Sequence, residues 1–197
     1  PQGATMLRVE ELRKATTDMT APELLRCLLV QEFPDGCAVT SALRARSVVV
    51  LHMIAEIDLA TPVIFCHAPY IFPESVEYRA RIVRQLGLTD VRDPAQDETE
   101  ILPQDQGHTE GILSDASGGG TIHSTVNLNK SLAGFNCWIS AAYHRPYGDD
   151  PTPRLIEEGR LLRVDPLMGW TQKDVHAYMA ERDLPHHPRI AVPTYHY

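Results

Sequence analysis

Two arginines and two serines lie close together in the segment 40–47, TSALRARS, which follows one apolar stretch and precedes another. Backbone N–H groups at the start of a helix, together with nearby guanidinium groups, bind anions such as phosphate. The segment therefore predicts an anion site built from Ser41, Arg44, Arg46 and Ser47. The arginines could equally be solvated or paired with Asp or Glu, and the residue types favour neither arrangement.

A cysteine and a histidine, Cys66 and His67, stand at the end of a second apolar stretch. Such a pair could act as a nucleophile or bind a metal, but neighbouring residues on a strand point to opposite faces. Cys66 is more often a small core residue in this position. A zinc or copper site assembled from His67, His123, Cys137 and His144 is a further hypothesis, although these residues lack the spacing of a metal motif.

The 197-residue chain has a formal net charge of −8, from 18 Lys and Arg against 26 Asp and Glu. This acidity argues against nucleic-acid binding, which needs a basic face, but a pocket for a small anion needs only a few cations. No apolar run reaches the ~18–20 residues that span a bilayer, and no secretory signal is visible, so we expect a cytoplasmic protein outside the membrane. The four cysteines are scattered without a CxxC, which argues against a disulfide framework or a structural metal site.

The elements that must position these residues alternate between strands and helices. This alternation predicts an α/β fold, three-layer and doubly wound, with a mostly parallel five-stranded sheet and helices on both faces. The predicted strands are 37–40, 62–66, 88–91, 137–141 and 161–164, and the main helices are 47–57, 74–85 and 171–182. Ligands of such sheets bind at the carboxyl ends of the strands. Four segments begin at those ends and should meet in one crevice: 41–47, 66–73, 141–149 and 166–170.

The length fits one domain. We expect N-terminal helices over 8–33, a sheet core over 36–182 and an extended tail over 183–197. The polar segment 93–120 is rich in Asp, Gln, Gly and Ser, and we interpret it as a long loop.

Several segments, in order, resemble the phosphoadenosine phosphosulfate (PAPS) reductase family, which has the adenine nucleotide α-hydrolase fold. The segment 40–47 stands where that family has its S-F-G-x-Q loop. VIFCHAPYIFPES over 63–75 is similar to the family's V-I-x-x-D-T-G-Y-x-F-P-E-T. The run 164–188 is similar to its N-P-L-x-x-W-x-x-x-D-V-x-x-Y followed by L-P-x-x-P. The resemblance covers the chain from Asp35 to Pro188.

The resemblance implies thiol-dependent reduction of an adenylyl sulfate to sulfite in sulfate assimilation. It also implies thioredoxin or glutaredoxin as the reductant and a homodimer. We expect no bound cofactor and no metal, because the cysteine pairs of the iron–sulfur reductases are lacking. The ligand, an adenine nucleotide or another small anion, would contact residues at the strand ends: Ser41, Arg44, Arg46, Ser47, His67, Tyr70, Lys130, His144 and Arg145.

The sequence departs from the family's pattern at positions that hold the ligand. Arg44 and Arg46 replace the glycine and the glutamine of the first loop, and a side chain at the glycine position blocks a close approach of the backbone. His67-Ala68-Pro69 replaces D-T-G of the second loop. In the family a tail cysteine attacks the sulfur, but no cysteine follows Cys137, so we expect the nucleophile to lie beyond Tyr197.

Two alternatives stay open at this point. One is a catalytically inactive or repurposed homologue that binds a different anionic ligand or a protein partner. The other is an enzyme of altered chemistry, or a metal site, built on Cys66, His67 and His144.

Overall fold

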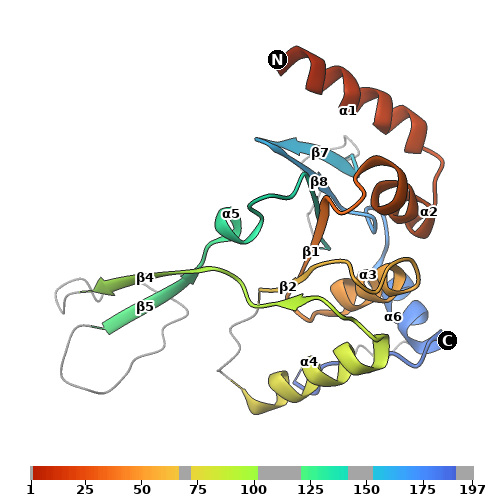
Figure 1. The fold of residues 1–197 in the computed structure, drawn as a ribbon. Coiled ribbons are helices and arrows are strands. Elements are labelled where there is room, and N and C mark those ends of the chain that lie inside the picture. Colours follow the sequence, from red (N-terminus) through yellow and green to blue (C-terminus); the bar gives the residue numbers. More distant parts are fainter. Residues whose placement is uncertain (1, 67–71, 102–120, 142–152, 190–197) are drawn as a thin grey trace.

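The computed structural model describes residues 2–66, 72–101, 121–141 and 153–189 (Figure 1). Six strands form one sheet in the order β3-β2-β1-β6-β8-β7, and every neighbouring pair is parallel except β7 and β8. This arrangement confirms the predicted α/β class with a mostly parallel sheet. The strands are β1 (Cys37–Ser41), β2 (Val63–Phe65), β3 (Val91–Arg92), β6 (Cys137–Ile139), β7 (Leu155–Glu158) and β8 (Leu161–Val164).

The sheet has one strand more than the five predicted. β7 pairs antiparallel with β8 through a two-residue turn, in which Gly159 has φ +59°. A left-handed residue is what a tight hairpin turn requires, and glycine adopts it without strain. β7 is an edge strand with only Leu155 buried, so its sequence lacks the apolar run by which the buried strands are recognised.

Most of the helices lie on one face of the sheet, together with the larger part of the core (Figure 1). This face presents Val39, Val63, Phe65 and Ile139, all fully buried, against α3, α4 and α6. The helices are α1 (Gln2–Thr16), α2 (Ala21–Arg26), the π-helical turn η1 (Cys27–Glu32), α3 (Ala45–Ala55), α4 (Pro73–Leu86), α5 (Leu128–Ser131) and α6 (Gln172–Glu181). None of them is long and apolar enough to cross a bilayer within the described ranges.

The opposite face carries a smaller cluster, in which Ala38, Ile64 and Leu161 pack with Leu132 just after α5. In the described part of the chain, α5 is the helix on this face.

The polar segment predicted as a loop contains a strand, which corrects that prediction. β4 (Gln96–Ile101) pairs antiparallel with β5 (Thr121–Val126) in a ribbon that projects away from the main body (Figure 1). Residues 102–120 lie outside the described part. β4 and β5 are far apart in sequence and largely polar, so no local apolar pattern predicts that they pair.

Candidate functional site

A cavity of about 710 Å³ lies at the carboxyl edge of the sheet, where β1 and β6 are neighbours. From β1 the chain continues to β2 and β3 on one side, whereas β6 and β8 lie on the other. This reversal of strand order splays the connecting segments and forms the usual ligand crevice of an open parallel sheet. Thr40 and Ser41 of β1 line the cavity together with Ser140 and Ala141 after β6. The predicted meeting of the strand-end segments is thus observed for 41–47, for Cys66 at the start of 66–73 and for Ala141 at the start of 141–149. The fourth predicted segment, 166–170, lies within the described part of the chain, and none of its residues lines the cavity.

The cavity is lined by basic and imidazole side chains. Among the described residues that form it there is no Asp or Glu, although the chain as a whole carries a net charge of −8. A concave surface that gathers cations and excludes carboxylates attracts anionic ligands. The six side chains are Arg44, Arg46, Arg163, His176, His186 and His187.

The turn between β1 and α3 is shaped by a chain of hydrogen bonds. The Leu43 N–H donates to Ser41 Oγ (3.1 Å), which donates to Ser47 Oγ (2.9 Å), which in turn donates to the carbonyl of Arg44 (2.8 Å). Leu43 has φ +57°, an uncommon conformation for a residue other than glycine, and its side chain is buried. The hydroxyls of Ser41 and Ser47, predicted to contact ligand, are therefore engaged in the turn and determine its shape.

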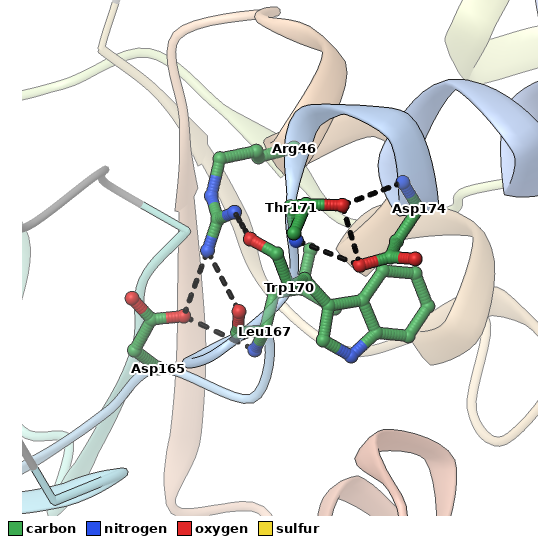
Figure 2. Close-up of polar contacts among 6 residues, drawn as sticks. All are labelled: Arg46, Asp165, Leu167, Trp170, Thr171 and Asp174. Carbon is green, nitrogen blue, oxygen red and sulfur yellow. Dashed lines mark hydrogen bonds and ion pairs between the residues drawn. The ribbon is translucent and has the colours of Figure 1, made fainter. Parts of the chain in front are cut away.

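Arg46 contacts the loop between β8 and α6 (Figure 2). Its Nη2 donates to the carbonyl of Leu167 (2.8 Å), and its Nη1 donates to the carbonyl of Trp170 (3.1 Å). Nη2 also lies 3.9 Å from Oδ1 of the buried Asp165, which accepts the Leu167 N–H at 3.1 Å. Of the two arrangements left open for Arg46, the structure shows pairing with an acid, Asp165. This guanidinium therefore stabilises the cavity wall through its contacts with the loop between β8 and α6.

Arg44 presents its side chain differently. It is the N-cap residue of α3, is exposed, and lines the cavity at the N-terminus of an 11-residue helix. The first N–H groups of such a helix lack intrahelical acceptors and carry a partial positive charge. Arg44 and these N–H groups form the part of the predicted anion site that is open to a ligand.

Of the other predicted ligand residues, the structure describes one, Lys130. Lys130 is exposed at the end of α5 and is not among the lining residues, to which α5 contributes Leu128. The remaining four lie outside the described residues: His67, Tyr70, His144 and Arg145.

Cys66 lines the cavity and is half-buried, with its Sγ 3.7 Å from the carbonyl oxygen of Ile64. Burial raises the pKa of the Cys66 thiol to about 11. At neutral pH the group is therefore a thiol, whereas nucleophilic attack and metal ligation both need the thiolate. This result weighs against chemistry built on Cys66.

The metal hypothesis for Cys137 is not supported. Cys137 is fully buried on β6, opposite Cys37 of β1, with which it pairs in register. The hydrogen bond with Cys37, followed by burial, holds the pKa of the Cys137 thiol well above its usual range. No cluster of three or more His, Cys, Asp or Glu side chains that could hold a metal occurs in the described part of the chain.

Several lining residues were not predicted from the sequence, among them Trp138, Arg163 and three histidines. Trp138 is half-buried and its Nε1 donates to Thr40 Oγ1 (2.8 Å), so the indole forms part of the cavity wall. Arg163 lies on the same sheet face and is paired with Glu158. The three histidines are His176 of α6 and the adjacent pair His186-His187, which stands between two prolines in the segment predicted as an extended tail. A run of histidines next to a predicted strand-end crevice is the signal that could have identified them.

The chain matches the family model described as phosphoadenosine phosphosulfate reductase domain over residues 36–189. It is 29% identical over 174 residues to the adenosine 5′-phosphosulfate reductase of Chelativorans sp. (strain BNC1), covering 87% of this chain and 71% of that protein. The enzyme of the same name from Mesorhizobium japonicum is 30% identical over 81% of this chain, and the chain spans 63% of its length.

Relatives named phosphoadenosine 5′-phosphosulfate reductase are also similar to this chain. The phosphoadenosine 5′-phosphosulfate reductase of Xylella fastidiosa (strain M12) is 26% identical over 82% of this chain and 70% of that protein. The crystal structure of the phosphoadenylyl-sulfate (PAPS) reductase of Candida auris, a phosphate complex, has a similar fold. It superimposes with a TM-score of 0.63 at 18% identity, covering 91% of this chain and 87% of that one.

Proposed function

Because the chain belongs to the phosphoadenosine phosphosulfate reductase domain family, we propose that its cavity binds an adenylyl sulfate for thiol-dependent reduction to sulfite. The exposed Arg44 at the start of α3 carries this proposal, in a cavity whose described lining also holds three histidines and no carboxylate. The other two lining arginines, Arg46 and Arg163, are paired with Asp165 and Glu158. An adenylyl sulfate brings two linked anionic groups and a purine. Arg44 and the start of α3 suit the anionic groups, and the apolar wall with Leu128 and Trp138 suits the purine.

The attacking thiol is not one of the four cysteines of this sequence. Cys27, Cys37 and Cys137 are buried, and Cys66 is protonated at neutral pH because burial raises its pKa to about 11. A thiolate is needed to attack the sulfur. The described residues therefore bind and orient the nucleotide, and the attack comes from a thiol outside them.

Thioredoxin or glutaredoxin is the partner that this chemistry calls for. The thiolate takes the sulfo group from the nucleotide, and the dithiol of the reductant then releases sulfite and becomes a disulfide, which accounts for both electrons. A homodimer is part of the same proposal. Family membership does not favour a repurposed binding module or an enzyme built on Cys66.

Calorimetry with adenosine 5′-phosphosulfate, its 3′-phosphorylated form and ATP tests the proposal. We expect one or both adenylyl sulfates to bind with a micromolar dissociation constant and ATP to bind at least tenfold more weakly. Replacing Arg44 by Ala should weaken adenylyl sulfate binding by about tenfold, which corresponds to one lost charge-assisted contact. If neither adenylyl sulfate binds, or if ATP binds equally well, the proposal is wrong.

A sulfite-release assay with thioredoxin and its reductase tests the assignment of the thiol. The variant Cys66→Ala should keep the sulfite release of the unmodified protein. A complete loss in this variant, with its affinity for the nucleotide unchanged, would place the reacting thiol at Cys66.

A further inference from the structure

Two histidines on one wall of the cavity are stacked against each other. His176 lies on α6 and His186 on the segment that follows it, with ring centroids 5.1 Å apart and ring planes at 30°. Both rings line the cavity that also contains Arg44 at the start of α3. The pair thus faces the space in which an anionic ligand would lie.

The segment that carries His186 is fastened to α4. The Tyr78 hydroxyl donates to the carbonyl of Pro185 (2.6 Å), and His187 Nε2 is 2.9 Å from Ser75 Oγ. His187 Nδ1 accepts the backbone N–H of Arg189 (3.2 Å), so the ring proton of a neutral His187 is on Nε2, where it donates to Ser75. His187 is therefore engaged on both ring nitrogens and positions its neighbour, whereas the stacked pair faces the cavity.

We propose that His176 and His186 together form a subsite for a tetrahedral dianion, such as the phosphate monoester of a nucleotide. A neutral imidazole offers one N–H donor and an imidazolium offers two, together with a positive charge. Because the pKa of His186 is lowered in the cavity, a bound dianion favours its protonated form, and the proton is released when the dianion leaves.

The charges around the pair support this behaviour. Burial, and then the neighbouring His176, lower the pKa of His186. Of the arginines that line the same cavity, Arg46 from α3 is paired with Asp165 and Arg163 from β8 with Glu158, whereas the exposed Arg44 adds positive charge to the lining. From α4, Tyr78 remains neutral because burial raises its pKa to about 12, and Glu74 is paired with Arg189. A bound dianion adds negative charge beside His186 and favours the protonated form of that ring.

This inference rests on the proposed function insofar as the phosphate belongs to an adenine nucleotide. The same chemistry would also hold free sulfate or phosphate. Adenosine 3′,5′-bisphosphate carries one phosphate monoester more than AMP, so the two nucleotides show whether the subsite takes a nucleotide phosphate. Inorganic sulfate, whose charge is constant between pH 6 and pH 8, shows whether it takes a free anion.

Calorimetry with the three probes at pH 6 and pH 8 is the test, with His176→Gln and His186→Gln as variants. The matched control is His52→Gln, since His52 bonds to Tyr178 outside the cavity lining. We expect the bisphosphate to bind at least tenfold more tightly than AMP at pH 6 and this advantage to shrink at pH 8. Either cavity variant should abolish the advantage and leave AMP affinity within twofold, and the control should change neither.

Proton uptake gives a readout that a purely structural role would not affect. Binding enthalpies at pH 7 in two buffers of different ionisation enthalpy should show uptake of up to one proton per bisphosphate, and none in His186→Gln. Equal binding of AMP and bisphosphate, with sulfate binding that depends on His186, would support the subsite with a free anion as its ligand. If no probe depends on His176 or His186, the subsite is refuted even where AMP binds and the proposed function stands. If neither nucleotide nor any adenylyl sulfate binds, the proposed function fails, and the sulfate result alone decides the subsite.

Discussion

The Nη2 atom of Arg46 donates a hydrogen bond of 2.8 Å to the carbonyl oxygen of Leu167, joining residues 121 positions apart in the chain. Through this contact the first turn of α3 and the loop before α6 form one unit around the cavity (Figure 2). The Arg46 side chain is only 16% exposed. Its charge therefore holds two segments together instead of meeting solvent.

Replacing Arg46 by Ala should lower the free energy of unfolding by about 2–3 kcal/mol, because two partly buried carbonyls lose a charged donor and the buried Asp165 loses its cation. Urea denaturation measures the change. The matched variant is Arg44→Ala two residues earlier, where the side chain is exposed. It should alter stability by less than about 0.5 kcal/mol and mainly weaken anion binding. An Arg46→Ala protein that is as stable as the unmodified one but does not bind anions would show that Arg46 contacts the ligand directly.

Most of the parallel core could be predicted from the sequence because β1, β2, β6 and β8 are short, largely apolar runs that are recognised locally. The parallel edge strand β3 consists of two exposed residues, and the predicted strand 88–91 overlaps it at Val91 only. β1 and β8 were predicted to within a residue, and α3, α4 and α6 to within two residues. The antiparallel additions could not be predicted in this way. β4 and β5 are stabilised by pairing with each other although residues 102–120 separate them in the chain, and β7 depends on a turn at Gly159. Such pairing leaves little trace in the apolar periodicity of either partner.

The location of the site was predicted better than the roles of its residues. The segment 41–47 does border the cavity, as expected of a loop after a central parallel strand. Whether Arg46 meets an anion or a carbonyl depends on Leu167 and Trp170, which the chain brings there only through the whole fold. The histidines were missed for the same reason, since His186 reaches the cavity because Tyr78 of α4 holds the segment in place.

Cys66 should react slowly with alkylating reagents. With a pKa raised to about 11, its thiolate at pH 7.5 is roughly 300-fold scarcer than that of an ordinary cysteine of pKa 8.5. Iodoacetamide labelling followed by mass spectrometry measures the rate, which should rise about tenfold per pH unit up to pH 10. A bound nucleotide should slow it further, because Cys66 lines the cavity. Fast labelling at neutral pH would mean that the thiol is activated and would reopen a catalytic role for it.

The Tyr78 hydroxyl donates to the carbonyl of Pro185 (2.6 Å), so Tyr78→Phe should loosen the segment with His186. The expected loss is about 1 kcal/mol of unfolding free energy for one hydrogen bond. The histidine-dependent advantage of the bisphosphate over AMP should shrink as well. Tyr178→Phe is the matched control, because Tyr178 bonds to His52 (2.9 Å) away from the cavity lining. It should lose similar stability and keep the full nucleotide preference. Equal nucleotide behaviour of the two variants would argue against the positioning role of Tyr78.

Stability should fall as the pH is lowered from 7.5 to 5.5, and His52 should account for part of the fall. Burial is the main cause that lowers the pKa of His52, and Arg182 contributes, while Glu56 acts in the opposite direction. A histidine whose pKa is lower in the folded than in the unfolded state binds its proton more readily on unfolding. The unfolded chain then holds more protons, and the free energy of unfolding decreases as pH drops below the ordinary histidine pKa of ~6.5.

The variant His52→Gln should therefore reduce the pH dependence of the free energy of unfolding by the equivalent of up to one proton. Urea denaturation at half-unit steps of pH measures it. Adding sulfate should reduce the remaining pH dependence contributed by His186, because a bound dianion favours the protonated form of His186 in the folded state.

Below pH ~4.5 the free energy of unfolding should fall again because of Asp174, whose hydrogen bonds with Thr171 lower its pKa. A lowered carboxyl pKa stabilises the fold above the unfolded value, and this contribution is lost as pH falls through the folded one. Replacing Thr171 by Ala should reduce the loss of stability below pH ~4.5 and leave the loss between pH 7.5 and pH 5.5 unchanged. If both losses change in this variant, they do not arise from Asp174 and the histidines separately.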